Sequence, residues 1–138
     1  MTNILYPEGK RKALTFSYDD GPIHDRRLVA LFNQHGIKGT FHLNSGKLDT
    51  PDFVSAQEVP TLYAGHEVSC HGVNHDFLTQ LSTNALIFEL YQDRRALEAL
   101  CDDFICGMSY AFGEYSNAVI QCAKTVGIEY ARTTKSTR

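Results

Sequence analysis

The stretch Leu14-Thr15-Phe16-Ser17-Tyr18-Asp19-Asp20-Gly21-Pro22 joins an apolar, strand-like run to two adjacent aspartates. Neighbouring carboxylates repel each other, so a fold that keeps both ionised needs a compensating cation, usually a divalent metal, or a shared proton. The alternative is plain turn chemistry, because Asp-Gly-Pro is typical of turns. The stretch therefore indicates either a site at the end of a strand or only a turn.

Two histidines follow about fifty residues later, in Gly65-His66-Glu67-Val68-Ser69-Cys70-His71-Gly72-Val73-Asn74-His75-Asp76. The spacing of His71 and His75 predicts that both imidazoles lie on one side of a helical turn. Two histidines and one carboxylate bind zinc and similar ions, and they leave coordination positions open for water and substrate. The alternative, two polar surface side chains, is weakened because the acidic pair supplies a second part of the same site.

Together these stretches resemble the polysaccharide deacetylases, also called the NodB-homology or carbohydrate esterase 4 family. Residues 17–22 are similar to the first family motif, Thr-Phe-Asp-Asp-Gly-Pro, and His71 and His75 to the second. Gly36-Ile37-Lys38-Gly39-Thr40-Phe41-His42 resembles the second strand of the family, and residues 64–68 its approach to the histidines. The order and spacing agree together, which is more specific than any single motif.

The resemblance implies a role for each of these polar residues. Asp19 corresponds to the catalytic base, and Asp20, His71 and His75 correspond to the metal ligands. The implied cofactor is one divalent metal ion. Zinc suits two histidines and a carboxylate best, and iron, cobalt, nickel and manganese are also compatible.

A third family motif corresponds to residues 108–113, a loop that is expected to line the substrate groove and to hold an oxyanion with a main-chain N–H. Two departures are visible: no Arg is found there to brace Asp19, and Ala111 replaces a proline. The candidate residues of this loop are Tyr110, Phe112 and Gly113. The aromatic rings expected either to line the groove or to pack in the core are Tyr18, Tyr110 and Phe112.

The last two family motifs, an acidic segment and a Leu-x-His that supplies the general acid, have no counterpart, and no histidine follows His75. The expected fold is a distorted (β/α) barrel of the NodB type, which needs roughly 200 residues. Residues 1–138 are therefore predicted to form a single domain whose C-terminal strands and helices are missing, unless the reaction uses another acid.

Alternating apolar runs predict strands that alternate with helices, which favours a parallel sheet. The expected strands cover residues 12–18, 38–43, 66–70, 106–110 and 128–132. The expected helices cover residues 23–35, a short segment capped by Thr50, a long segment after Ser82 and a segment between Ser116 and Gly127. The carboxyl ends of parallel strands share one rim, so the aspartates, the histidines and the 108–113 loop are expected to converge there.

Composition excludes several classes of protein. A net charge of −3 offers no electrostatic basis for binding nucleic acid, and no apolar stretch is long enough to cross a membrane. Residues 1–10 lack the pattern of a signal peptide, which favours a cytoplasmic location. The four cysteines form no CxxC pair and are expected to be reduced thiols, with Cys70 in the core.

The predicted function is that of a metal-dependent hydrolase that removes acetyl groups from N-acetylated sugars or polysaccharides, so the expected partner is a carbohydrate substrate. Two alternatives stay open: a metal-dependent amidase acting on a non-sugar amide or cyclic imide, and a non-catalytic carbohydrate-binding module. No pattern in the sequence indicates an oligomeric state.

Overall fold

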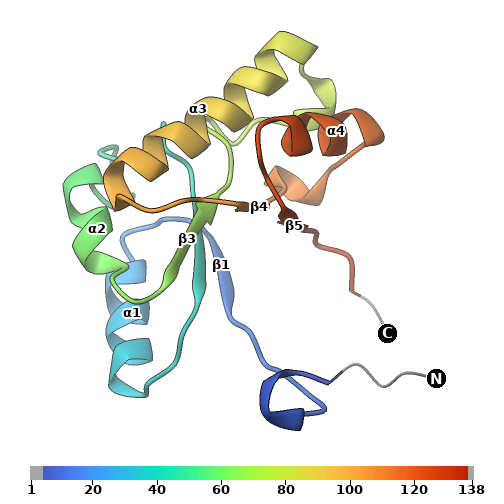
Figure 1. Cartoon of the computed structure of the whole chain (residues 1–138). Helices are drawn as coiled ribbons and strands as arrows, with labels where there is room; N and C mark the ends of the chain where they lie inside the picture. The colour runs from blue at the N-terminus through green and yellow to red at the C-terminus, as the bar shows by residue number, and fades with distance from the viewer. Residues whose placement is uncertain (1–4, 137–138) are drawn as a thin grey trace.

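A computed structural model describes residues 5–136 and contains five strands connected by helices (Figure 1). The strands are β1 (Ser17–Asp20), β2 (Thr40–Leu43), β3 (Glu67–Cys70), β4 (Gly107–Ser109) and β5 (Tyr130–Arg132). The α-helices are α1 (Asp25–Gln34), α2 (Val59–Leu62), α3 (Thr83–Cys101) and α4 (Asn117–Thr125). Short 3₁₀ helices are η1 (Pro7–Gly9), η2 (Ala56–Glu58), η3 (Leu78–Gln80) and η4 (Ala111–Gly113).

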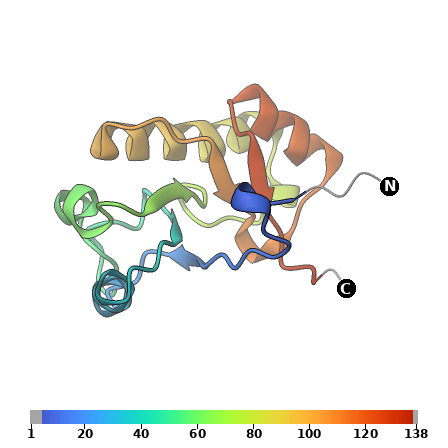
Figure 2. The same ribbon diagram turned by 60° about the horizontal axis from the view of Figure 1, so that its bottom comes forward.

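The strands form one parallel sheet in the order β1-β2-β3-β4-β5, so each strand pairs with its neighbour in the chain. Crossovers between parallel strands are almost always right-handed, and in this strand order they carry every helix to the same side of the sheet. Figures 1 and 2 show the helices around the outside of a curled sheet. This is part of the wall of a (β/α) barrel, as the resemblance implies.

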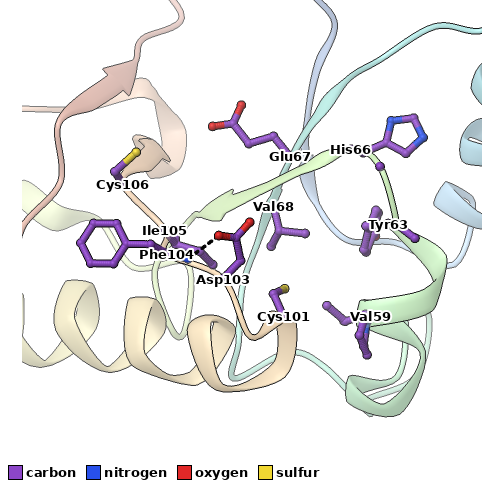
Figure 3. Close-up of a pocket in the computed structure, with 13 residues that line it drawn as sticks. Val59, Tyr63, His66, Glu67, Val68, Cys101, Asp103, Phe104, Ile105 and Cys106 are labelled. Atoms are coloured by element: carbon purple, nitrogen blue, oxygen red, sulfur yellow. Dashed lines mark hydrogen bonds between the residues drawn. The ribbon is translucent and has the colours of Figure 1, made fainter.

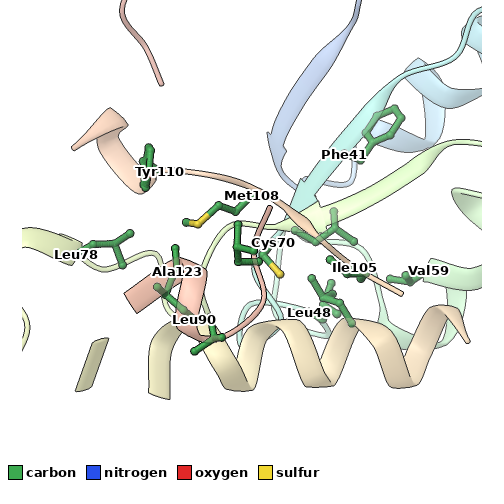
Figure 4. Packing of buried hydrophobic residues seen from close by; sticks show 14 of the residues in the cluster. Phe41, Leu48, Val59, Cys70, Leu78, Leu90, Ile105, Met108, Tyr110 and Ala123 are labelled. Atoms are coloured by element: carbon green, nitrogen blue, oxygen red, sulfur yellow. The ribbon is translucent and has the colours of Figure 1, made fainter. Parts of the chain in front are cut away.

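Side chains alternate between the two faces of the sheet, as successive residues of a strand must. The outer face packs against the helices and forms the apolar core, in which Phe41, Leu43 and Met108 are fully buried (Figure 4). The inner face carries polar residues. Asp19 on β1 pairs in register with His42 on β2, and both lie on this inner face.

Strands β2 to β5 and helix α1 are one to three residues shorter than expected, and two differences are larger. β1 begins at Ser17 and ends at Asp20, so both aspartates belong to the strand instead of following it. No helix begins at Thr50, because its hydroxyl donates 2.6 Å to the main-chain oxygen of Lys47 and closes a turn. The next helical segment begins after Ser55, whose side chain forms a capping box with Glu58.

The other helix starts follow the sequence. The side chain of Ser82 accepts a hydrogen bond from the N–H of Ala85, and that of Ser116 accepts one from the N–H of Val119. These caps satisfy N–H groups that have no partner within the first turn of a helix.

All four cysteines are free thiols, and Cys70 lies in the core with 1% of its surface exposed, as expected. Among residues 5–136, none of the helices combines the length and the apolar character needed to cross a bilayer. Residues 1–4 of the segment used for the signal-peptide prediction lie outside the described residues.

Candidate metal centre

Three potential metal ligands meet at the rim formed by the carboxyl ends of the strands. Asp20 is the last residue of β1, His71 directly follows β3, and His75 lies in the next loop. Oδ1 of Asp20 lies 3.5 Å from Nε2 of His71 and 3.4 Å from Nε2 of His75. One ligand atom from each residue lies within 4.8 Å of the other two, so the structure brings these three residues together.

The chemistry of these atoms fits a divalent cation. Oδ1 of Asp20 is buried and has no hydrogen-bond partner, which is costly for a carboxylate oxygen unless a cation faces it. Nδ1 of His71 lies 2.9 Å from the main-chain oxygen of Ser109, so Nδ1 carries the proton and Nε2 presents a lone pair toward Asp20. Burial also lowers the pKa of His71, which favours the neutral imidazole that binds metals.

The loop that carries the histidines differs from the helical turn expected from their spacing. Residues 71–77 form no helix, and His75 has a left-handed backbone with φ of 63°. Asp20 is also left-handed, with φ of 78°. Such conformations are uncommon for residues other than glycine, and they concentrate at functional sites where the surrounding structure holds them.

The neighbouring aspartate, Asp19, is held by Arg132 at the end of β5. Nη2 of Arg132 donates a hydrogen bond to Oδ1 of Asp19 and forms an ion pair with it. The prediction that no Arg braces Asp19 was therefore wrong, because it considered only the arginine position of the third motif. The expected strand at 128–132 contained the missing signal, since its last residue, Arg132, lies on the same rim.

Ser109 connects Asp19 to the metal ligands. Its hydroxyl donates 2.9 Å to Oδ1 of Asp19 and lies 2.7 Å from Nδ1 of His71, whose proton it accepts. Burial raises the pKa of Asp19, but the hydrogen bonds from Arg132 and Ser109 and the nearby positive charge outweigh burial and leave this pKa below its ordinary value. Asp19 is thus ionised at neutral pH.

Two further polar residues support this arrangement from within the barrel wall. Nε of Arg132 donates 2.8 Å to the hydroxyl of Ser17, which lies 2.9 Å from Nε2 of His42. His42 is 1% exposed, and its burial lowers its pKa to about 4. The sequence analysis assigned neither residue to the site, although the strand alternation places both on the face that carries Asp19.

The three residues of the 110–113 loop that were predicted to contact the substrate differ in their exposure and in their contacts. Tyr110 is buried in the apolar core and stacks on Tyr115, with ring centroids 5.1 Å apart, so little of its ring is accessible to a substrate (Figure 4). Phe112 is 50% exposed and its ring contacts that of His75, with a centroid separation of 4.4 Å. The N–H of Gly113 donates 2.8 Å to the oxygen of Tyr110 and is therefore already engaged.

The remaining aromatic candidate, Tyr18, also lies away from the metal ligands. Its ring packs on the outer face of the sheet against Phe32 and Phe41, at centroid distances of 5.9 and 6.1 Å. A different ring, that of Phe77, stacks on Phe112 with centroids 3.8 Å apart and 41% of its surface exposed. The aromatic surface beside the metal ligands therefore consists of Phe77 and Phe112.

A pocket lies at the opposite end of the strands. It has a volume of about 190 Å³ and is lined by residues around the start of β3 and the end of α3, including His66, Glu67 and Asp103 (Figure 3). It contains none of the residues that gather at the rim. The site is therefore assigned from its side-chain chemistry rather than from the size of a cavity.

Comparisons with known proteins identify the family of the chain. A sequence model of the family described as polysaccharide deacetylase matches residues 6–131. Chitin deacetylase 2 of the fungus Cryptococcus neoformans var. grubii is 32% identical over 85 residues, which cover 60% of this chain and 18% of the fungal protein. The chain thus spans less than a fifth of that relative.

Solved structures show the same fold. A deacetylase of Streptococcus pyogenes, solved with acetate, superimposes with a TM-score of 0.88 at 19% identity, over 94% of this chain and 58% of that one. A polysaccharide deacetylase of Bacillus cereus superimposes with a TM-score of 0.85 at 18% identity, over 94% of this chain and 42% of that one. The chain therefore corresponds to part of each of these longer chains.

Proposed function

The chain belongs to the polysaccharide deacetylase family, and we propose that it is a metal-dependent hydrolase that removes acetyl groups from N-acetylated sugars or polysaccharides. One observation carries the proposal. Asp19, braced by Arg132 and Ser109, stands directly beside the cluster of Asp20, His71 and His75. A carboxylate base next to three metal ligands is one arrangement that supports hydrolysis of an amide.

Asp20, His71 and His75 are assigned to one divalent ion, for which zinc is the best match to the donor set. When bound, such an ion supplies a Lewis acid that lowers the pKa of water and polarises a carbonyl group. His71 is kept in the ligating tautomer by the main-chain oxygen of Ser109.

Asp19 is assigned as the general base. Arg132 and Ser109 both donate hydrogen bonds to its Oδ1. We therefore assign Oδ2 as the oxygen that accepts the proton from water. The lowered pKa of Asp19 keeps the carboxylate ionised and ready to accept that proton at neutral pH. General-base catalysis of this kind typically contributes a factor of about 10² to 10⁴ to the rate.

The 110–113 loop is assigned to the acetyl group and its oxyanion. The N–H of Tyr110 donates to the main-chain oxygen of Arg132, and the N–H of Gly113 donates to that of Tyr110. The N–H that binds the oxyanion is therefore assigned to Ala111 or Phe112. Phe77 and Phe112 offer an exposed apolar surface beside the ligands on which a sugar ring can lie.

Arg132 bears on the two alternative functions, a non-catalytic binding module and an amidase acting on a non-sugar amide. A non-catalytic binding module was suggested in part by the missing brace for Asp19, and Arg132 supplies that brace. An amidase acting on a non-sugar amide uses the same metal and base, so only the substrate distinguishes it.

The test combines metal content with acetate release. Purified protein is dialysed against zinc, and acetate is measured with chitooligosaccharides, peptidoglycan fragments and small amides. We expect one zinc per chain, which is lost in His75→Asn and Asp20→Asn. Asparagine tolerates the left-handed backbone at both positions, so the two changes remove the imidazole and the negative charge without adding strain.

His35→Asn is the control, because His35 is exposed and remote from the rim in sequence and fold. Retention of stoichiometric zinc by both site variants would refute the ligand assignment. Release of product from small amides only would replace the sugar substrate with the amidase alternative, and binding of oligosaccharide without turnover would favour the binding module.

A further inference from the structure

Helix α3 carries two fully buried carboxylates that the proposed reaction does not use. Glu89 is 1% exposed and Asp93 is 0% exposed, and they lie one helical turn apart on the face that packs against β3 and the histidine loop. Burying a carboxylate is costly unless its oxygens accept hydrogen bonds, so their partners indicate what they do. In the described chain, their hydrogen bonds come from N–H groups of residues 45, 71, 72, 74 and 76.

Asp93 holds the backbone of the first histidine. Its Oδ2 accepts hydrogen bonds from the N–H groups of His71 and Gly72, each at 2.9 Å. Its Oδ1 accepts one at 2.8 Å from the N–H of Ser45, which follows β2. The side chain of Asn44 donates to the oxygens of His71 and Gly72, each at 2.8 Å. Side chains therefore bind the N–H and the oxygen of both His71 and Gly72, the two residues that follow β3.

Glu89 holds the backbone around the second histidine. Its Oε1 accepts a 2.7 Å bond from the N–H of Asn74 and a longer, 3.5 Å contact from that of Asp76, and its Oε2 accepts 3.0 Å from the side chain of Asn74. His75 lies between these two residues and has the left-handed backbone. Gly72 allows the close approach of Glu89, since a Cβ there would lie 2.8 Å from Oε1.

The two pairs match in spacing. His71 and His75 are four residues apart on the loop, and Glu89 and Asp93 are four residues apart on α3, in the opposite order along the chain. Asp93 thus binds the backbone of His71 itself, and Glu89 binds the backbone on both sides of His75. Because the loop has no regular secondary structure to hold it, these carboxylates supply the order that a helix or strand gives to its own residues.

We propose that Asp93 and Glu89 are positioning residues that set the affinity and geometry of the metal site, Asp93 by holding the backbone of His71 and Glu89 by holding the residues on either side of His75. The proposal rests on the metal site of the proposed function. It follows because fixed ligands bind a metal more tightly than ligands that must be ordered on binding, and loss of such supporting groups typically costs ten- to a hundredfold in affinity.

The experiment compares Asp93→Asn, Glu89→Gln and a matched control, Glu98→Gln. Glu98 lies on the same helix and also accepts a backbone hydrogen bond, from Ile105 at 3.2 Å, but far from the rim. Zinc affinity is measured by competition with a chromophoric chelator, cobalt absorption reports ligand geometry, and thermal unfolding of the metal-free protein reports stability.

We expect Asp93→Asn to bind zinc about ten- to a hundredfold more weakly, Glu89→Gln to show a smaller loss, and both to change the cobalt spectrum. The control is expected to lose stability but to keep the affinity and spectrum of the wild type. A purely structural role predicts that all three variants lose stability and that none changes metal binding.

Zinc affinities within twofold of the wild type for both Asp93→Asn and Glu89→Gln would overturn the proposal. If Asp93→Asn fails to fold, the affinity and spectrum of Glu89→Gln decide it, because Gln retains one oxygen for the N–H of Asn74. If the wild-type protein binds no zinc or cobalt, the proposed metal site and this inference both fall, whereas unaffected variants of a metal-binding wild type refute this inference alone.

Discussion

The two faces of the sheet carry different kinds of residue for different purposes. Phe41 and Met108 on the outer face are completely buried against helices and contribute to the core. On the inner face, the side chains of Ser109 and Arg132 both donate hydrogen bonds to Asp19. Adjacent residues of one strand therefore serve stability and chemistry separately, because successive side chains of a strand point to opposite faces.

The comparison shows where change is tolerated. Apolar packing is non-directional, so the outer face needs volume and shape. The inner face needs particular donors and acceptors, because a buried polar group without a hydrogen-bond partner lowers the stability of the folded protein by the cost of its desolvation. The following substitutions test this division, from the largest expected effect to the smallest.

Asp19→Asn on the inner face is expected to lower the rate of acetate release by about 10² to 10⁴, because the amide cannot act as a base. Its zinc content is expected to stay at the wild-type level, since Asp20 supplies the ligand oxygen. The matched change on the outer face of the same strand, Tyr18→Phe, is expected to leave the rate unchanged. A wild-type rate for Asp19→Asn would show that Asp19 is not the base.

Met108→Ala on the outer face is expected to lower the free energy of unfolding by about 2 to 5 kcal/mol, because it leaves a cavity in the core. Ser109→Ala, one residue further on the inner face, is expected to cost about 1 to 2 kcal/mol for its lost hydrogen bonds. Urea unfolding of the metal-free proteins measures both. A larger loss for Ser109→Ala would break the division between the faces.

Arg132→Gln is expected to slow acetate release by about ten- to a hundredfold, since a hydrogen bond to a charged group contributes about 1.5 to 3 kcal/mol. Arg132→Lys is expected to recover part of the rate because it keeps the charge but loses the second contact, with Ser17. Arg95→Gln, an exposed position on α3, is the control. Equal rates for Arg132→Gln and the control would remove Arg132 from the site.

The smallest expected effect is that of His42 on the free energy of unfolding, and it depends on pH. Its pKa is lowered to about 4 by burial, so between pH 6.5 and about 4 the unfolded chain takes up a proton that the folded protein does not. Stability therefore falls as the pH drops through this window, by about 1 kcal/mol between pH 7 and 5.5.

His42→Gln is expected to remove that part of the pH dependence, whereas His35→Gln, at an exposed position, is expected to keep it. Urea unfolding at several pH values gives the two slopes. Identical slopes for His42→Gln and the wild type would show that His42 does not titrate as its burial suggests.

Sequence patterns predicted helix starts correctly at Ser82 and Ser116, where the start depends only on neighbouring residues. Ser82 and Ser116 were expected to cap helices and do so, because a cap depends on residues within one turn. Thr50 was expected to start a helix and instead closes a turn with Lys47, since the same hydroxyl chemistry serves both. The helical spacing of His71 and His75 was misleading for a similar reason: an irregular loop also places the two imidazoles side by side.

The sequence by itself determined the parallel α/β fold and the residues available for a metal site, because hydrophobic alternation, caps and motif spacing are properties of neighbouring residues. Only the tertiary structure decided what holds those residues. Arg132 lies 113 positions from Asp19 and Ser109 lies 90 positions from it, and Asp93 reaches His71 across 22. Such partners depend on strand order and on the packing of α3 against β3, which join residues that no local pattern connects.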